Sequence, residues 1–435
     1  MLNNFKKRIE AKEAVVGVIG LGYVGLPLAV ELAIEGFLVK GIEINEDRVR
    51  EVNSGKSPID DIPDEKLAAI VSKGKLVATQ DYGIVDDLDI IVICVPTPLN
   101  KLRDPDLSFL LDAMEGMRNN LSKGILVILE STTYPGTTRE VVLSELEESG
   151  LKAGRDFFLA FSPERIDPGN QKYGIRNTPK VVGGITKECT DLAVLFYEQF
   201  VESVVRVTST ETAEVVKLLE NTFRSINIAL VNEMAIMCDK LGVDVWEVVD
   251  AAATKPFGFM RFTPGPGLGG HCIPVDPHYL SWKMRTLDYK ARFIELATEV
   301  NTEMPHYVAD LVVEGLNRLK KSTNGAKILI VGVAYKLETD DIRESPALDI
   351  MEILEERGAD LIYHDPHVPE MEWNGNEFRS QELTAELVRT ADAVVIVTNH
   401  SKLNLKLIVD QAKLVIDTRN AVNGSRGNVL KLGAL

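Results

Sequence analysis

Three glycines near the N-terminus constrain the fold more than any other feature of the sequence. Gly20, Gly22 and Gly25 form a G-x-G-x-x-G pattern directly after the apolar, β-branched run Ala14–Ile19, and the helix-like stretch Pro27–Ile34 follows. In a strand–turn–helix unit the first glycine permits a tight turn, the second lets a ligand approach the backbone, and the third lets the helix pack on the strand. The pattern therefore predicts a βαβ unit at the start of a parallel sheet.

Strand–helix alternation continues along the next part of the chain. The apolar runs expected to be strands are Phe37–Ile44, Ile90–Val95, Ile125–Leu129, Phe158–Phe161 and Val181–Val182. Asp47–Asn53 has the pattern of a helix between two of them. Such alternation predicts a parallel, doubly wound sheet with helices on its faces.

The pattern changes near Thr210. From Glu211 to Leu241 apolar residues recur at helical spacing, with no proline or glycine. This predicts a helix of about 30 residues, or about 45 Å at 1.5 Å per residue, which is typical of a connector or a dimer-forming element. A loop rich in glycine and proline, Lys255–Pro277, follows, and then a further helical region that runs to about Arg318.

Strand–helix alternation returns in the last part of the chain. We expect strands at Lys327–Ala334, Asp360–His364, Ala393–Thr398 and Leu414–Asp417, and a helix at Pro346–Arg357. The 435 residues are too many for one ordinary core. The predicted fold class is α/β, with two Rossmann-like doubly wound domains (1–207 and 321–435) joined by a long-helix central domain (208–320).

Composition excludes several classes of function. Lys plus Arg total 48 against 65 Asp plus Glu, a net charge of −17, which argues against nucleic acid or an anionic membrane as the main partner. No apolar run approaches the ~18–20 residues that span a bilayer, and the N-terminus has no apolar signal core. Four scattered cysteines without a C-x-x-C pair fit a reducing compartment, so we expect a cytoplasmic protein.

An acidic residue closes the second expected strand. Glu43 lies about 20 residues past the glycines, where a carboxylate accepts ribose hydroxyls and repels a 2′-phosphate, so NAD is favoured over NADP. The helix N-terminus after the glycines would offer its N–H groups to the pyrophosphate. The alternative is a glycine turn without a dinucleotide. Arg48 would reach the adenosine side or would be a solvated helix residue.

Two further expected strands end in threonine-containing loops. Thr97 lies in Cys94-Val-Pro-Thr-Pro and Thr132 in Glu130-Ser-Thr-Thr. The carboxyl ends of parallel strands are where ligands bind in doubly wound folds, so both hydroxyls are candidates for the edge of the cofactor site. Ordinary turn chemistry is the alternative.

The segment from Pro264 to Pro277 is the least ordinary stretch of the chain. Its glycines and prolines fix an irregular backbone that a substrate could approach closely, and Cys272 emerges from it. A thiolate is a strong nucleophile, although an inert buried cysteine is the commoner case. A zinc set of His271, Cys272, Asp276 and His278 matches no standard ligand spacing, so no metal is predicted.

Polar residues share one face of the long helix. Lys217, Asn221 and Arg224 fall at positions i, i+4 and i+7. They could be a solvated stripe, or Lys217 and Asn221 could face the cysteine, where a lysine would stabilise a developing alkoxide or a thiolate. Glu164 and Arg165 lie in a turn after Phe161, and a carboxylate there could activate water.

Seven segments occur together in the order of a known family. The chain resembles the UDP-glucose/GDP-mannose 6-dehydrogenases in GLGYVGLP, CVPTP, ESTTYPGTT, SPERIDPG, AEVVKLLENTFR, PGPGLGGHCIPVDP and GVAYKLETDDIRESPA. Within the family it looks most like UDP-N-acetylglucosamine 6-dehydrogenases, with the UDP-N-acetylmannosamine enzymes close behind. The resemblance implies an NAD-binding domain, a helical dimer core, a UDP-binding domain and a double oxidation of a sugar C6 alcohol by two NAD.

The resemblance also implies a role for each matching residue. The catalytic set would be Cys272 as nucleophile, Lys217 and Asn221 for the alcohol proton and the oxyanion, and Glu164, Thr132 and Asp276 for water and proton transfer. The residues lining NAD would be Gly20, Gly22, Tyr23, Val24, Gly25, Glu43, Arg48, Thr97 and Thr132, with Arg343 at the pyrophosphate. The UDP-sugar contacts would be Arg165, Ile166, Lys217, Asn221, Arg224, Gly267 and Lys336.

The chain departs from the UDP-glucose members at two places. Val275 stands where many of them carry a lysine, and Arg261 is not clearly in register with an arginine they carry before the cysteine loop. Glu43 replaces the more frequent Asp and keeps its charge. We therefore expect a UDP-N-acetylhexosamine substrate and a homodimer or higher oligomer. The alternatives are a single-hydride β-hydroxyacid dehydrogenase and a non-catalytic nucleotide-sugar-binding protein.

Overall fold

A computed structural model describes residues 2–59, 62–100, 103–166, 170, 172–270, 273–424 and 426–434. The chain divides into two compact units. The first unit extends to Glu220 and includes His278–Tyr289, and the second unit comprises Asn221–Pro277 and the chain from Lys290 onward. Among the described residues, no helix combines the length and the apolar character needed to cross a bilayer.

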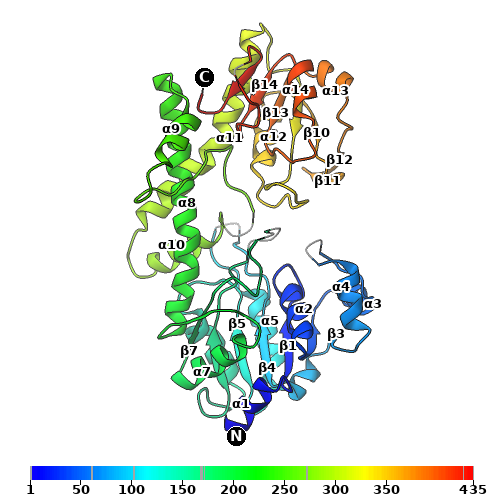
Figure 1. The fold of residues 1–435 in the computed structure, drawn as a ribbon. Coiled ribbons are helices and arrows are strands. Elements are labelled where there is room, and N and C mark those ends of the chain that lie inside the picture. The colour runs from blue at the N-terminus through cyan, green and yellow to red at the C-terminus, as the bar shows by residue number, and fades with distance from the viewer. Residues whose placement is uncertain are drawn as a thin grey trace. The chain divides into compact units, whose positions relative to one another are not determined.

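The first unit contains an eight-stranded sheet in the order β3-β2-β1-β4-β5-β6-β7-β8 (Figure 1). Its strands are β1 Val15–Ile19, β2 Leu38–Ile42, β3 Leu76–Thr79, β4 Ile90–Ile93, β5 Leu126–Leu129, β6 Phe158–Phe161, β7 Lys180–Gly184 and β8 Val204–Arg206. The order of the first six is that of a doubly wound nucleotide-binding fold. The expected parallel pairing is found throughout except between β6 and β7, which are antiparallel.

Helices cover both faces of this sheet, so its central strands are apolar on both sides. In β4, Ile90 and Val92 enter one core, whereas Ile91 and Ile93 enter the other, because successive side chains point to opposite faces. The helical segments are α1 Leu2–Glu10, α2 Gly25–Glu35, α3 Glu46–Ser54, α4 Asp64–Val71, η1 Tyr82–Asp87, α5 Ser108–Arg118, η2 Thr138–Val142, α6 Leu143–Glu147 and α7 Lys187–Tyr197.

The strands at the two edges of this sheet were not predicted from the sequence. β3 and β8 have four and three residues, and Val77 and Val205 are exposed. Edge strands are paired on one side only and are often short and partly polar, so they lack the continuous apolar run of a central strand.

The predicted long helix is confirmed as α8, Thr210–Leu241, with 32 residues. It is followed by α9 Val245–Ala252, α10 Asp276–Arg285 and α11 Arg292–Arg318. The glycine- and proline-rich loop ends two residues earlier than expected, because α10 begins at Asp276 rather than after Pro277.

The second unit contains a parallel sheet in the order β10-β9-β13-β14-β15. Its elements are β9 Lys327–Val331, α12 Pro346–Glu356, β10 Asp360–His364, α13 Ala385–Thr390, β13 Ala393–Ile396, α14 Leu405–Gln411, β14 Val415–Asp417 and β15 Val429–Lys431, with a hairpin of β11 Glu370–Trp373 and β12 Asn376–Arg379. This is the second doubly wound order of nucleotide-binding folds, so the predicted fold class is confirmed. The hairpin and β15 were not predicted.

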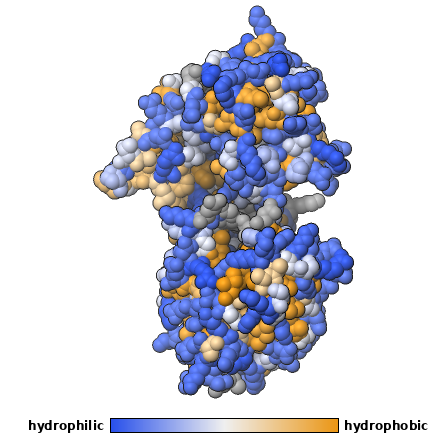
Figure 2. Space-filling model, turned by 45° about the vertical axis from the view of Figure 1, so that its right-hand side comes forward, coloured by the Kyte–Doolittle hydropathy of each residue, from blue (hydrophilic) through white to orange (hydrophobic). Residues whose placement is uncertain are grey.

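Apolar side chains are largely withdrawn from the surface of both units. On the face drawn in Figure 2, hydrophilic residues predominate and apolar residues gather only in smaller areas. This agrees with a chain in which 26% of the residues are charged.

Candidate functional site

The loop after β1 has the geometry of a dinucleotide cradle. Gly20 has a φ of +88°, and an added Cβ would lie 2.6 Å from the carbonyl oxygen of Cys94. An added Cβ at Gly25 would lie 1.8 Å from the carbonyl oxygen of Gly20, whereas one at Gly22 would meet nothing within 4 Å. The first and third glycines are thus required by the protein itself, and the second borders open space where a pyrophosphate fits.

The buried Glu43 carboxylate lies beside this loop. Its Oε2 accepts a hydrogen bond from the Leu21 amide at 3.0 Å, and its Oε1 accepts one from the Asn45 amide at 3.0 Å. Arg48 pairs with Oε2 at 3.4 Å, so it is not simply a solvated helix residue. A carboxylate has about four acceptor positions, which leaves room for a ribose hydroxyl. The residues present therefore fit NAD.

The loops after β4 and β5 are tied to one another. The Thr97 hydroxyl donates to the Thr132 carbonyl oxygen at 2.6 Å, and the Tyr279 hydroxyl of α10 donates to the Thr97 carbonyl oxygen. The Thr97 proton is thus occupied, and this hydroxyl can offer a ligand only its lone pairs. Val24 immediately precedes α2, and Tyr23 is exposed beside the glycine loop.

Glu164 follows β6 and is held from two sides. Its Oε1 accepts from the amides of Arg165 at 2.7 Å and Ile166 at 2.6 Å, and its Oε2 accepts from the Lys180 ammonium at 2.9 Å. Burial by itself would raise the pKa of Glu164, but Lys180 and the backbone amides outweigh burial and hold this pKa below its usual value.

The Arg165 side chain turns away from the carboxylate that precedes it. Its Nη2 lies 2.6 Å from Glu220 of α8, and its Nη1 donates to the Pro179 carbonyl oxygen at 2.5 Å. This guanidinium therefore ties the turn after β6 to the long helix.

The polar residues predicted on one face of α8 differ in their exposure to solvent. Lys217 and Asn221 are each 8% exposed, so a solvated stripe is wrong for these two residues, whereas Arg224 is exposed. The Asn221 side-chain amide donates to the carboxylate of Asp276, which is also buried and begins α10. The helix thus presents a buried ammonium and a buried amide one turn apart.

The glycine-rich loop of the second unit packs closely against neighbouring segments at Gly265, Gly267 and Gly270. The Gly265 amide donates to Asn232 Oδ1 of α8 at 2.9 Å. An added Cβ at Gly267 would lie 3.1 Å from Pro346, and one at Gly270 would lie 2.7 Å from the Tyr335 ring. Both glycines have positive φ values, +140° and +81°. A side chain at either glycine would clash, because the loop packs closely against the segment after β9.

Other predicted residues lie on or near this loop. The Gly270 amide donates to the Arg343 carbonyl oxygen at 3.1 Å, while the Arg343 guanidinium binds Asp341 at 2.6 Å. Lys336 is partly buried in the turn after β9. His271 and Cys272, the predicted nucleophile, lie outside the described residues.

Arg419, two residues past β14, was not predicted from the sequence as a site residue. Its Nε donates to the Val397 carbonyl oxygen at 2.8 Å, and a Cβ on Gly265 would come within 2.6 Å of its Nη1. Within the described ranges no acidic side chain pairs with it, and burial lowers its pKa to about 10. A partly buried cation without an acidic partner is costly, so this guanidinium has the character of an anion-binding group. Its place at the carboxyl end of a predicted strand was the available signal.

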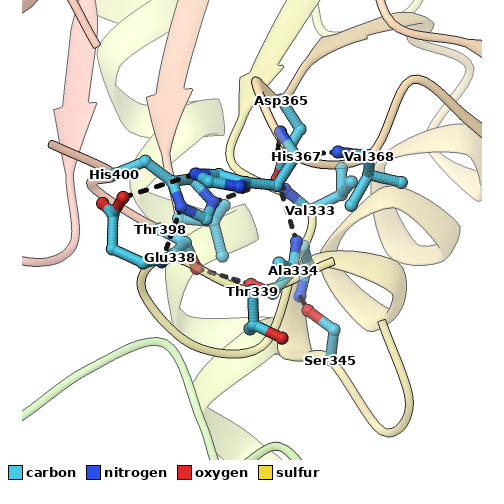
Figure 3. Close-up of polar contacts among 12 residues, drawn as sticks. Val333, Ala334, Glu338, Thr339, Ser345, Asp365, His367, Val368, Thr398 and His400 are labelled. Atoms are coloured by element: carbon cyan, nitrogen blue, oxygen red, sulfur yellow. Dashed lines mark hydrogen bonds and ion pairs between the residues drawn. The ribbon is translucent and has the colours of Figure 1, made fainter. Parts of the chain in front are cut away.

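A second polar cluster surrounds Asp365 at the end of β10 (Figure 3). The Asp365 carboxylate accepts amides from the loop after β9, Val333 at 2.8 Å and Ala334 at 3.1 Å, and lies 3.2 Å from His400 Nε2. His400 Nδ1 accepts from the amide of Glu338, whose φ is +57°. The cluster thereby secures the loops that follow two adjacent strands.

The same cluster brings together possible metal ligands from Glu338, His367 and His400, within 4.8 Å of one another. Metal-bound histidines almost always donate from their second ring nitrogen. Here one nitrogen of His400 faces an amide donor and the other faces a carboxylate, so the hydrogen bonds assign the proton to Nε2 and leave no lone pair for a metal. The cluster is therefore structural in this arrangement.

Comparisons with known proteins agree with this geometry. Three models of the UDP-glucose/GDP-mannose dehydrogenase family match the chain: the NAD binding domain at residues 14–201, the central domain at 211–303 and the UDP binding domain at 329–424. A UDP-N-acetyl-D-mannosamine dehydrogenase of Pyrococcus horikoshii is 36% identical over 94% of this chain and 96% of its own length.

Further relatives and a solved structure extend the likeness. A UDP-N-acetyl-D-glucosamine 6-dehydrogenase of Pseudomonas aeruginosa is 37% identical over 82% of this chain and 84% of its own length. The structure of the Pyrococcus horikoshii UDP-D-ManNAc dehydrogenase covers 97% of this chain, and 99% of that chain is matched, with a TM-score of 0.88 at 35% identity. The chain belongs to the UDP-glucose/GDP-mannose dehydrogenase family and is an NAD-dependent UDP-sugar dehydrogenase, an oxidoreductase.

Proposed function

We propose that the protein oxidises the C6 alcohol of a UDP-N-acetylhexosamine to the uronic acid in two steps on one site. The balanced reaction consumes the alcohol, two NAD⁺ and one water, and forms the carboxylate, two NADH and three protons. The observation that carries this proposal is the buried pair Lys217 and Asn221 on α8, with Asn221 bound to Asp276, four residues past Cys272. Relatives named for N-acetylated sugars support the substrate class.

The residues divide the chemistry between them. NAD, when bound, supplies the hydride acceptor for each oxidation. Lys217, directly or through a water, takes the alcohol proton. The Cys272 thiolate adds to the aldehyde, and Lys217 and Asn221 stabilise the oxyanion of the thiohemiacetal. After the second oxidation, Glu164 or Asp276 takes a proton from the water that hydrolyses the thioester, and Thr132 takes part in the proton transfer.

The remaining residues are assigned to two ligands, NAD and the UDP-sugar. We propose that NAD lies on the glycine loop and Glu43, with Arg48, Thr97, Thr132 and Arg343 around it. For the UDP-sugar, we add Arg419 as a phosphate contact, because its partly buried guanidinium has no acidic partner among the residues that the structure describes. The remaining substrate contacts are the predicted set Arg165, Ile166, Arg224, Gly267 and Lys336.

The expected three-domain division and the dimer also belong to the proposal. The ranges 1–207, 208–320 and 321–435 are supported by the three separate family matches. The homodimer is supported by a row of exposed apolar side chains on α8, formed by Leu219, Phe223, Leu230, Met237 and Leu241. At 100° per residue these five lie within about 40° of one another around the helix.

Product stoichiometry tests the function. Purified protein with NAD should form two NADH per UDP-sugar consumed, and the panel should include UDP-N-acetylglucosamine, UDP-N-acetylmannosamine and UDP-glucose. UDP-N-acetylglucosamine is the predicted best substrate, with UDP-N-acetylmannosamine the second candidate. Cys272→Ser should slow or stall the reaction between the oxidations. One NADH with released aldehyde, or full activity of Cys272→Ser, would contradict the mechanism.

A further inference from the structure

Lys180 is a buried lysine enclosed by acceptors in the first unit. It begins β7 and is only 7% exposed, although lysine is almost never buried without a partner. Its Nζ lies 2.9 Å from Glu164 Oε2 and 3.0 Å from Glu130 Oε1. The same atom lies 5.3 Å from the centroid of the Tyr197 ring. One ammonium thus bridges two carboxylates and rests on an aromatic face.

The two carboxylates differ in their surroundings. Glu130 is 1% exposed, accepts a hydrogen bond from the Tyr197 hydroxyl, and has Cys94 Sγ 4.0 Å from its Oε2. Burial raises the pKa of Glu130, whereas Lys180 and the Ile166 amide overcome burial and lower the pKa of Glu164. Lys180 and Lys217 favour the ionised form of Glu164 and the Glu130 carboxylate opposes it, so of the two carboxylates Glu164 is the more readily ionised.

Among the described residues, the contacts of Glu164 leave one acceptor position open. Two amides fill Oε1, and Lys180 takes one position on Oε2. A carboxylate offers about four positions, so the remaining one is on Oε2. Any proton that Glu164 accepts without losing a hydrogen bond must therefore arrive at Oε2, beside the Lys180 ammonium.

We propose that Lys180 is a positioning residue for Glu164: anchored on Glu130, its ammonium holds the Glu164 carboxylate ionised, with the free lone pair of Oε2 directed to the hydrolytic water. This inference rests on the proposed role of Glu164 in thioester hydrolysis. Stability alone is a poor explanation of the cluster, because buried ion pairs replaced by apolar residues are often no less stable. Lys180 itself contacts neither substrate nor cofactor in this scheme.

The test follows thioester hydrolysis in a single turnover of the full-length enzyme with NAD and the best UDP-sugar of the panel, across pH. Lys180→Met should slow hydrolysis at pH 7 by about tenfold or more, and should move the acidic limb of the profile up by about one pH unit or more, since the cation that keeps Glu164 ionised is gone. Lys180→Arg should restore much of the rate. Glu130→Gln removes a competing anion and should move the same limb to lower pH.

Two further variants separate the inference from the function on which it rests. Lys66→Met removes a cation that pairs with Glu31 at 2.7 Å in the same unit. This variant should leave the pH dependence of thioester hydrolysis unchanged. Glu164→Gln should slow hydrolysis by about 100-fold or more, and adding Lys180→Met to it should cost little further, because Lys180 acts through Glu164.

Each outcome decides one of the two claims. Wild-type hydrolysis in Glu164→Gln would refute the role of Glu164, and with it the basis of the inference. Slow hydrolysis in Glu164→Gln, combined with an unchanged profile in Lys180→Met, would overturn the inference alone. So would an equal loss from Lys180→Met in the presence and absence of Glu164. If Lys180→Met does not fold, an unshifted limb in Glu130→Gln overturns the proposal.

Discussion

The charged groups that this fold removes from water differ in whether neighbouring residues compensate their charge. Glu164 is surrounded by donors and has a lowered pKa, while burial raises the pKa of Glu214 of α8 to about 7 despite its contacts with Gly136 and Thr138. Arg419 is the opposite case, a partly buried cation without an acidic partner among the described residues. A group that the fold leaves unbalanced is the better candidate for binding a charged ligand.

At this scale we predict the effect of Arg419→Met. Removing an uncompensated guanidinium should leave the melting temperature of the free protein unchanged or higher. It should also weaken UDP binding by about tenfold or more, because a charged hydrogen-bond donor to the phosphates is lost. Calorimetric titration with UDP and thermal unfolding with and without UDP measure both effects.

The matched control is Arg379→Met, on the exposed hairpin strand β12, where the arginine pairs with Glu377. Arg379→Met should alter neither the melting temperature nor the affinity for UDP. Unchanged UDP affinity in Arg419→Met would exclude this guanidinium from the phosphate site.

At the scale of elements, the turn after the first strand of each sheet is built in the same way. Gly20 packs against the carbonyl oxygen of Cys94 after β4, and Gly332 packs against that of Thr398 after β13, where an added Cβ would be 2.6 Å and 2.1 Å away. Each turn is also held by an acid from the end of the second strand, Glu43 or Asp365. Close contact between neighbouring strand ends is therefore what demands glycine here.

The glycines after β1 lead to a paired prediction. Gly25→Ala would place Cβ 1.8 Å from the Gly20 carbonyl oxygen, so the loop must shift, and both the melting temperature and NAD affinity should fall. Gly22→Ala meets no protein atom within 4 Å. It should keep the melting temperature within about 2 °C and still weaken NAD binding severalfold or more, because the methyl group occupies the space of the pyrophosphate.

Fluorescence titration with NADH and thermal unfolding distinguish the two variants. Wild-type NADH affinity in Gly22→Ala would show that the pyrophosphate does not lie against this glycine.

At the scale of the whole molecule, two doubly wound folds occur in one chain, and their acids are not equivalent. Glu43 retains an acceptor position beside its three donors. Asp365 is saturated by four backbone amides and His400. The first fold can therefore offer a carboxylate to a ribose, whereas the second uses the corresponding carboxylate to hold its own loops together.

The oligomer is also a property of the whole molecule. Leu230 is 54% exposed in the middle of the apolar row on α8, and a charge there should weaken the proposed dimer without disturbing either core. Leu230→Glu should shift the protein toward monomer in analytical ultracentrifugation, while Lys240→Glu, at an exposed position of the same helix outside the row, should not. A wild-type assembly in Leu230→Glu would place the interface elsewhere.

Much of the fold could be predicted because its signals are local. Strand and helix periodicity, the absence of proline and glycine over α8, and the glycines of the first turn all reflect steric rules that act within a few residues. The short edge strands and the β11–β12 hairpin were missed, because their partly exposed residues form no apolar run. Glu43, Lys217 and Asn221 could be named in advance as candidates from motif and helix spacing, and Asp276 from the family resemblance.

Only the tertiary structure decided which charged and polar side chains pair with one another. Lys180 stands at the start of a strand, and nothing local shows that Glu130, 50 residues earlier, and Glu164 both reach its ammonium. Arg419 meets Gly265 across 154 residues, and Asn221 meets Asp276 across 55. A sequence determines which side chains carry charge. Whether a charge is buried, paired or left for a ligand depends on long-range packing, because desolvation and Coulomb energy depend on every neighbour in space.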